Sequence, residues 1–197
     1  MRQEATRSLD QRLVNWLEQR TVSKLLRDYG LQGRLLDVPC GYGRFWPTFS
    51  GLGTRFFGAD LDPEMVRLAD ESNGYENGRR ALCGDVFQLP FADDAFETTV
   101  SIRLLHLNYT GEQRQQILRE LVRVSRRFVL ISLYRFTPLH GLVRRWHSTP
   151  GRVRLMTENQ LADLVISVDV RLELLQPLHR FLHMQTFALL SKKASPS

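Results

Sequence analysis

The sequence predicts an α/β fold, in which a mostly parallel sheet of seven strands carries helices on both faces and ends in a C-terminal antiparallel hairpin. Short apolar runs alternate with helical patterns as far as Leu133, which is typical of strands joined by crossover helices. The last two apolar runs have no helix between them, and a direct turn can join only antiparallel neighbours. The 197 residues suit a single domain, 1–197, because no repeat or low-complexity stretch divides them.

The N-terminal segment, from about Ala5 to Tyr29, has the spacing of an amphipathic helix, and Gly30 would end it. Its expected core face consists of apolar residues three and four positions apart, namely Leu9, Leu13, Trp16, Leu17, Leu25, Leu26 and Tyr29. A short helix is expected to begin near Arg44. Another begins at Asp62-Pro63-Glu64, with Asp62 as the N-cap and proline at the first helical position, where its missing N–H costs nothing.

The remaining elements follow from apolar runs that end at turn residues. The seven strands are expected at 35–38, 55–59, 80–83, 96–102, 128–133, 168–175 and 184–190, the last two joined by a turn at Pro177. Thr110 and Thr157 precede two further helical stretches, 111–124 and 158–165, and their hydroxyls suit the N-cap position.

Three successive strand-like runs each end at an acid, and these three acids are Asp37, Asp60 and Asp85. Parallel strands bring such ends to one edge of the sheet, where open α/β folds bind their ligands. The turn after the first strand, Pro39-Cys40-Gly41-Tyr42-Gly43, carries two glycines that let a ligand approach bare backbone. A lone acid after a strand is often only a turn or cap residue, but three in succession favour a site for a nucleotide-like ligand.

A dinucleotide-binding domain is the main alternative for such a glycine turn. Its third glycine would fall at Trp46, where this chain has a bulky indole followed by Pro47. An acid before the glycines also suits a cationic ligand better than a pyrophosphate. A phosphate-binding P-loop is excluded because no Gly-Lys-Ser/Thr follows the glycines.

The segment Leu36-Asp37-Val38-Pro39-Cys40-Gly41-Tyr42-Gly43 resembles the Leu-Asp-x-x-Cys-Gly-x-Gly motif of class I S-adenosylmethionine (SAM)-dependent methyltransferases of the type 11-like group. Asp60-Leu61-Asp62-Pro63-Glu64-Met65 and the block 83–97 are similar to that group's later motifs, in the same order. The resemblance covers about residues 35–133 and implies a Rossmann-like seven-stranded sheet with a terminal hairpin. The chain departs from the group at Ser125-Arg126-Arg127, which replaces a usual Pro-Gly-Gly turn.

The resemblance implies that SAM is the cofactor and that no metal is required. Asp37 would accept a hydrogen bond from its ammonium group, Asp60 from both ribose hydroxyls, and Asp85 from adenine N6. The other expected cofactor contacts are the turn residues Pro39, Gly41 and Gly43, the adenine neighbours Leu61, Met65 and Val86, and Ser101 under the sulfonium.

Two residues just beyond the fourth strand, His106 and Tyr109, are the catalytic candidates on the acceptor side, and Tyr134 is a further one. Methyl transfer from a sulfonium is an in-line displacement that depends mainly on positioning, so a weak base suffices. His106 could equally be a structural residue bonded to the backbone.

The segment 135–157 is expected to form an acceptor-side cap. Between Tyr134 and Thr157 there are five arginines, two histidines and no acid, which accounts for five of the six net positive charges. Such a segment could clamp a carboxylate or phosphate, lie on an anionic membrane surface, contact RNA, or form a solvated loop. The complete lack of acids favours an anionic acceptor or surface.

Composition narrows the class of protein. With 43% hydrophobic and 24% charged residues the chain is typical of soluble proteins, and the apolar run 128–133 is far shorter than the ~20 residues of a membrane span. The N-terminus lacks an apolar signal core, so we expect a cytoplasmic protein with Cys40 and Cys83 reduced.

The sequence therefore favours a SAM-dependent methyltransferase that acts on a small-molecule or lipid-like acceptor, with an anionic acceptor preferred. The alternatives are an RNA methyltransferase, supported by the basic segment, and a catalytically silent SAM-binding partner protein. The acceptor, the methylated atom and the oligomeric state are left open.

Overall fold

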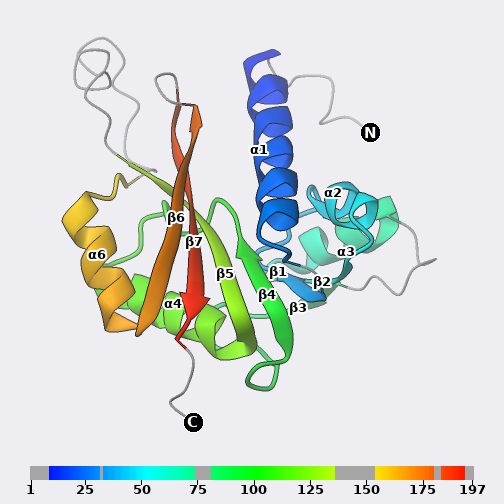
Figure 1. The fold of residues 1–197 in the computed structure, drawn as a ribbon. Helices are drawn as coiled ribbons and strands as arrows, with labels where there is room; N and C mark the ends of the chain where they lie inside the picture. The colour runs from blue at the N-terminus through cyan, green and yellow to red at the C-terminus, as the bar shows by residue number, and fades with distance from the viewer. Residues whose placement is uncertain (1–8, 32, 74–80, 136–153, 180–182, 194–197) are drawn as a thin grey trace.

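The computed structural model describes residues 9–31, 33–73, 81–135, 154–179 and 183–193. Within them, one seven-stranded sheet has the order β3-β2-β1-β4-β5-β7-β6 (Figure 1). The strands are β1 (Arg34–Asp37), β2 (Arg55–Asp60), β3 (Ala81–Cys83), β4 (Phe96–Ser101), β5 (Ser125–Tyr134), β6 (Val170–His179) and β7 (His183–Lys192). The helices are α1 (Leu9–Asp28), α2 (Trp46–Gly51), α3 (Pro63–Asn73), α4 (Gly111–Val124) and α6 (Glu158–Ser167).

The first five strands are parallel neighbours, whereas β7 runs antiparallel to both β5 and β6. The predicted fold class is therefore confirmed. Asp37 at the end of β1 is level with Gly58 of β2 and Val100 of β4. From β1 the chain passes to β2 and β3 on one side and then to β4 and β5 on the other. This reversal makes the ends of β1 and β4 the switch point at which such sheets bind ligands.

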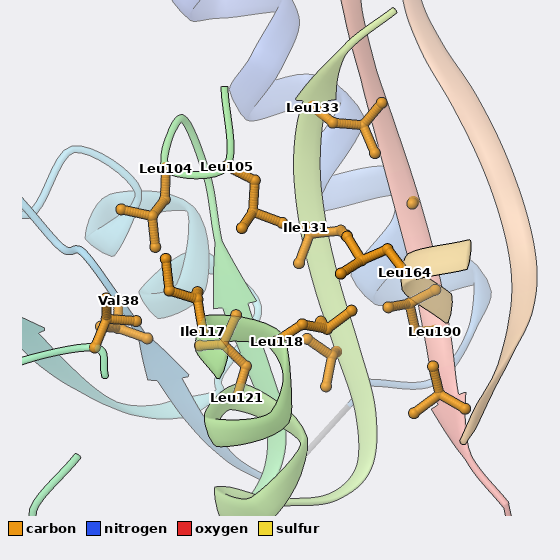
Figure 2. Close-up of a cluster of buried hydrophobic side chains, with 14 of the residues drawn as sticks. Val38, Leu104, Leu105, Ile117, Leu118, Leu121, Ile131, Leu133, Leu164 and Leu190 are labelled. Carbon is orange, nitrogen blue, oxygen red and sulfur yellow. The ribbon is translucent and has the colours of Figure 1, made fainter. Parts of the chain in front are cut away.

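Both faces of the sheet are covered because the central strands are apolar on both sides. In β1, Leu35 belongs to one buried cluster and the adjacent Leu36 belongs to the other. The first cluster packs α1 and α2 against the sheet. The second packs α4 and α6, with Ile117, Leu118, Leu121 and Leu164 facing Ile131 and Leu190 (Figure 2).

The predicted helix caps are confirmed. The Thr110 and Thr157 hydroxyls accept hydrogen bonds from the Gln113 and Gln160 N–H groups, and each glutamine side chain bonds back to the N-cap backbone. The Asp62 carboxylate accepts a hydrogen bond from the Glu64 N–H at 2.9 Å, which makes Asp62 the cap of α3.

The predicted core face of α1 is partly wrong. Leu13 and Trp16 are 56% and 53% exposed, and Tyr29 is also exposed. The stripe that faces the sheet instead includes the buried residues Glu18 and Val22. Glu18 is an acid in the middle of an apolar helix face, so a search for apolar periodicity alone cannot find this stripe.

The predicted turn at Pro177 is wrong, because β6 continues to His179 and Pro177 pairs with Thr186 of β7. Proline is tolerated there because β6 is the edge strand of the sheet, and the pairing shifts register between Pro177 and His179. Other boundaries also move. The first two helices begin at Leu9 and Trp46, and β5 starts at Ser125 directly after α4. Most of the predicted cap segment 135–157 lies outside the described residues.

Candidate functional site

A cavity of about 530 Å³ opens at the C-terminal ends of β1, β2 and β4. Residues of α1 line it together with residues at the strand ends. Its lining consists of Gln11, Val14 and Asn15 from α1, Pro39 to Tyr42 together with Arg44 and Phe45 after β1, Asp60 of β2, Ile102 and Arg103 after β4, and Tyr134 of β5. This volume lies in the ordinary range for small-molecule sites, and the location is the switch point of the sheet.

The glycine turn after β1 forms the floor of the cavity. Gly41 and Gly43 have φ values of +54° and +75°, a backbone conformation that favours glycine. A Cβ built on Gly41 would meet no atom within 4 Å, so the missing side chain leaves open space at the cavity wall. Pro39 and Gly41 line the cavity, whereas Gly43 does not, and the cofactor contacts expected of all three stay predictions.

Asp37 ends β1, directly before this turn, and is fully buried. Within the described residues, its Oδ2 atom accepts no hydrogen bond of normal geometry, and the Trp46 indole N–H interacts weakly with this carboxyl. Burial raises the pKa of this carboxyl to about 8, although the positive charge of nearby Arg44 opposes the shift. An unpartnered buried carboxyl oxygen at this position suits a cationic hydrogen-bond donor.

Asp60 lies at the cavity edge and is held by the backbone. Its two carboxylate oxygens accept hydrogen bonds from the Gly41 N–H at 2.8 Å and the Asp62 N–H at 3.0 Å. A carboxylate has about four acceptor positions, so capacity for two further donors remains. This arrangement fixes the orientation of Asp60 and suits a vicinal diol.

The remaining predicted cofactor contacts are more spread out. Asp85 is exposed after β3, where its carboxylate accepts a hydrogen bond from the Phe87 N–H. Leu61 is 71% exposed, whereas Val86 is buried in the core and Met65 is half-buried. Ser101 is buried at the end of β4, and its hydroxyl has no hydrogen-bond partner among the described residues. None of these five lines the cavity itself, so their cofactor roles stay predictions.

On the acceptor side, His106 and Tyr134 lie together, with ring centroids 4.6 Å apart. Burial, reinforced by the charge of Arg103, lowers the pKa of His106 to about 4 against the opposing charge of Glu18. The imidazole is therefore neutral near pH 7. Tyr109 instead packs edge-on against Phe87 at 5.8 Å, and burial together with the charge of Asp85 raises its pKa. Tyr134 lines the cavity, and His106 lies behind it in ring contact without lining the cavity itself. Tyr109 does not line the cavity either, so both catalytic roles stay predictions.

The sequence reasoning missed a cluster of charged residues that joins α1 to the cavity. Glu18 binds both Arg44 and Arg103, and the Asn15 side-chain oxygen accepts a hydrogen bond from each arginine. The available signal was Glu18 itself, an acid four residues from both Val14 and Val22 on one helix face. The arginines follow β1 and β4 at the predicted ligand edge, so their position was also informative.

Comparison with known proteins finds methyltransferases similar to this chain. Residues 36–129 match the family model described as a methyltransferase domain. The tRNA (carboxymethyluridine(34)-5-O)-methyltransferase of Arabidopsis thaliana is 29% identical over 104 residues, which cover 51% of this chain and 24% of that protein. The demethylmenaquinone methyltransferase of Thermobifida fusca is 29% identical over 99 residues, or 49% and 42% of the two chains. The present chain therefore matches less than half the length of these relatives.

Solved structures show the same fold. The magnesium protoporphyrin IX methyltransferase of Synechocystis PCC 6803, solved with bound S-adenosylhomocysteine (SAH), superposes with a TM-score of 0.80 at 18% identity, covering 95% of this chain and 89% of that one. The likeness concerns the fold. The family match over 36–129 and this shared fold agree with the resemblance to class I SAM-dependent methyltransferases that the sequence motifs carry.

The residues present fit the cofactor of this family. The cavity combines the open backbone at Gly41 with the spare acceptor positions of Asp60, and the buried carboxyl of Asp37 precedes the glycine turn. Among the residues that the structure describes, no group of three or more His, Cys, Asp or Glu side chains could hold a metal ion. No helix in the described part of the chain has both the length and the apolar character needed to span a membrane.

Proposed function

We propose that this protein binds SAM in the cavity at the ends of β1, β2 and β4 and transfers its methyl group to a small-molecule or lipid-like acceptor. One observation carries the proposal: Asp60 and the open glycine turn border a single cavity of suitable size, and buried Asp37 ends the strand from which that turn begins. When bound, SAM supplies a methyl group on an electrophilic sulfonium.

The chain's own residues would hold the cofactor at three points. Asp37 accepts a hydrogen bond from the ammonium group, and Asp60 accepts from the ribose hydroxyls with the positions that Gly41 and Asp62 leave free. Asp85 and the Val86 backbone receive the adenine edge, with Leu61 and Met65 beside it. Gly41 and Gly43 let the cofactor lie against the backbone, and Ser101 lies beneath the sulfonium.

The acceptor would lie against His106 and Tyr134. A neutral His106 accepts a hydrogen bond from the attacking hydroxyl or amine and aligns its lone pair with the methyl group. Because the pKa of His106 is low, its main contribution is orientation rather than proton removal. Tyr109 is the second catalytic candidate. We further propose that residues 1–197 form one domain in which segment 135–157 caps the acceptor side.

A tRNA acceptor is the second candidate, because the Arabidopsis thaliana relative is a tRNA methyltransferase and segment 135–157 is strongly basic. Methyl transfer to tRNA at low salt, lost steeply as salt rises, would support this candidate over the small acceptor.

Cofactor binding is tested first, by thermal unfolding and calorimetry with SAM, SAH and NAD on the wild type, Asp60→Ala and Asp62→Ala. Asp62 is the matched control, because it caps α3 two positions away without bordering the cavity. SAM and SAH should raise the unfolding temperature of the wild type and of Asp62→Ala, but not of Asp60→Ala, and NAD should have no effect. Ligand at ~100 times its dissociation constant adds about 2.7 kcal/mol of stability.

Activity is then tested with radiolabelled SAM against small carboxylates and hydroxyl compounds, lipid-like quinones and tRNA. Transfer to any acceptor that requires His106 would support the enzyme. Tight SAH binding without transfer to any acceptor would favour the silent SAM-binding protein. Absence of SAM and SAH binding at millimolar concentration would contradict the proposed function.

A further inference from the structure

The wall of the cavity contains an ionic cluster with more positive than negative charge. Glu18 of α1 is completely buried and accepts hydrogen bonds from Arg103 Nε and Nη2, both at 2.8 Å, through its two carboxylate oxygens. Arg44 Nη1 binds the same carboxylate. One carboxylate thus holds two guanidinium groups, and the neutral Asn15 oxygen completes the contact at 2.8 Å to Arg44 and 3.2 Å to Arg103.

The second acid near this cluster does not cancel the excess charge. Asp37 faces Arg44, but its burial favours the neutral carboxyl at pH 7. Glu18, Arg44 and Arg103 together therefore carry one excess positive charge in a partly enclosed place, where an unpaired charge is costly. Asp60 lines the same cavity, but its carboxylate is held by the Gly41 and Asp62 N–H groups. An anion at this place would lower that cost.

Both arginines still have donors for such an anion. Within the described residues, no hydrogen bond involves Arg103 Nη1 or Arg44 Nη2. Both side chains line the cavity, and that of Arg103 is 37% exposed. Glu18 and Asn15 hold each guanidinium from the α1 side, so the donors are positioned before a ligand arrives. A planar guanidinium matches the two oxygens of a carboxylate.

The backbone of Arg103 gives independent support for a binding role. Its φ is +63°, a left-handed conformation that arginine rarely adopts, and its N–H is fixed by the Ser132 hydroxyl at 2.7 Å. Strained backbone of this kind collects at ligand sites, where a side chain must be aimed in a direction that ordinary geometry does not give. Here it carries Arg103 into the wall shared by α1 and the acceptor side.

We propose that Arg44 and Arg103, held by Glu18, form a carboxylate-binding subsite in the cavity wall. The proposal rests on the function proposed above. Two sources could supply the carboxylate: the amino acid end of the cofactor, or an acidic acceptor held beside His106 and Tyr134. Glu18 is a positioning residue in either case.

The test uses the full-length protein and the variant Arg103→Asn. Asparagine tolerates the left-handed backbone, so this change removes the guanidinium without adding strain. Arg103→Lys keeps the charge but loses the planar fork, and Arg67→Gln is the control because it breaks exposed ion pairs with Glu64 and Glu71 on α3. The probes are SAH, 5′-methylthioadenosine, which lacks the amino acid end, and benzoate followed by ligand-observed NMR.

Each source predicts its own result. If the cofactor supplies the carboxylate, Arg103→Asn weakens SAH by about 10- to 100-fold but leaves 5′-methylthioadenosine unchanged, and SAH displaces benzoate. If the acceptor supplies it, SAH affinity is unchanged and benzoate binds the SAH-saturated wild type but not Arg103→Asn. In both cases Arg103→Lys is intermediate and Arg67→Gln behaves as the wild type.

Two results would overturn the subsite. One is that neither SAH nor benzoate binding depends on Arg103. The other is that Arg103→Asn weakens SAH and 5′-methylthioadenosine equally while lowering the unfolding temperature, as expected of a scaffold residue. Failure of the wild type to bind SAH at all would instead contradict the proposed function, and benzoate binding to the free protein would then still report on the subsite.

Discussion

Binding of SAH is expected to strengthen about tenfold per pH unit between pH 6 and pH 7.5, because Asp37 must lose a proton to receive the ligand's ammonium group. The pKa of this buried carboxyl is about 8 in the free protein. At pH 7 roughly one molecule in ten then carries the carboxylate, and the apparent dissociation constant exceeds the intrinsic one by the same factor of about ten. At pH 6 the factor is about one hundred.

The neighbouring groups do not produce this dependence. His106 has a pKa of about 4 and is neutral throughout the range. Burial raises the pKa of the Cys40 thiol well above the range. Calorimetry in two buffers of different ionisation enthalpy should therefore find about 0.9 proton released per SAH at pH 7. The control ligand 5′-methylthioadenosine, which has no ammonium group, should release none.

Asp37→Asn tests the assignment. The variant should bind SAH with little pH dependence, so its loss relative to the wild type is small at pH 6 and grows as the pH approaches 8. A flat wild-type affinity between pH 6 and pH 7.5, or a loss in Asp37→Asn that is the same at every pH, would refute the reasoning.

The same carboxyl affects stability without ligand. Its pKa in the folded protein lies above the ordinary value of 3.8, so the folded protein keeps a proton that the unfolded chain loses between about pH 4 and pH 8. This group therefore lowers the free energy of unfolding as the pH rises through that window. Asp37→Asn removes the trend, so its stability relative to the wild type should improve toward pH 8 in urea titrations without cofactor.

Three further predictions concern single residues. Gly41→Ala should lower the free energy of unfolding by about 1–2 kcal/mol because of its left-handed backbone, and should strongly weaken SAH binding. Gly30→Ala, with a similar φ of +58° away from the cavity, should lose stability without losing SAH affinity. Chemical denaturation measures the first effect and calorimetry the second. Glu18→Gln should cost about 3 kcal/mol in urea unfolding because it leaves two guanidinium groups unpaired, while Glu64→Gln in an exposed pair should cost less than about 1 kcal/mol. His106→Gln should lower kcat without changing the SAH dissociation constant, and the wild-type pH–rate profile should show no inflection between pH 6 and pH 7; an inflection there that the variant abolishes would contradict the neutral imidazole.

The sequence predicted the fold well because its strongest signals are local. The alternation of strands and helices, the caps Asp62, Thr110 and Thr157, and the direct connection of the last two strands each depend on residues close together in the chain. The turn predicted at Pro177 was wrong because proline is typical of turns, whereas β6 tolerates it only because that strand lies at the sheet edge. Edge position is a property of the whole sheet, which no local pattern contains.

The cofactor edge of the site was predictable for a related reason. Once the strands are parallel, their carboxyl ends share one edge, so Asp37, Asp60 and the glycine turn had to meet. The opposite wall was not predictable in this way, because α1 reaches the cavity through contacts between residues 18, 44 and 103, far apart in sequence. The charge pattern of α1 contained a signal, but periodicity treats Glu18 as a polar interruption rather than a buried partner.

The two walls impose different chemistry on one ligand. On the sheet side, buried Asp37 and backbone-fixed Asp60 offer acceptors, whereas on the α1 side Arg44 and Arg103 offer donors beyond those that Glu18 uses. The ammonium and diol groups of a cofactor need acceptors, whereas a carboxylate, on the cofactor or on an acidic acceptor, needs donors. Asp60, Arg44 and Arg103 line the same cavity. Since an uncompensated charge in a partly buried wall destabilises the free protein, its presence beside Tyr134 and His106 is best explained by a ligand that neutralises it. The position of Glu18 then follows: it holds both arginines in place while leaving one positive charge for that ligand.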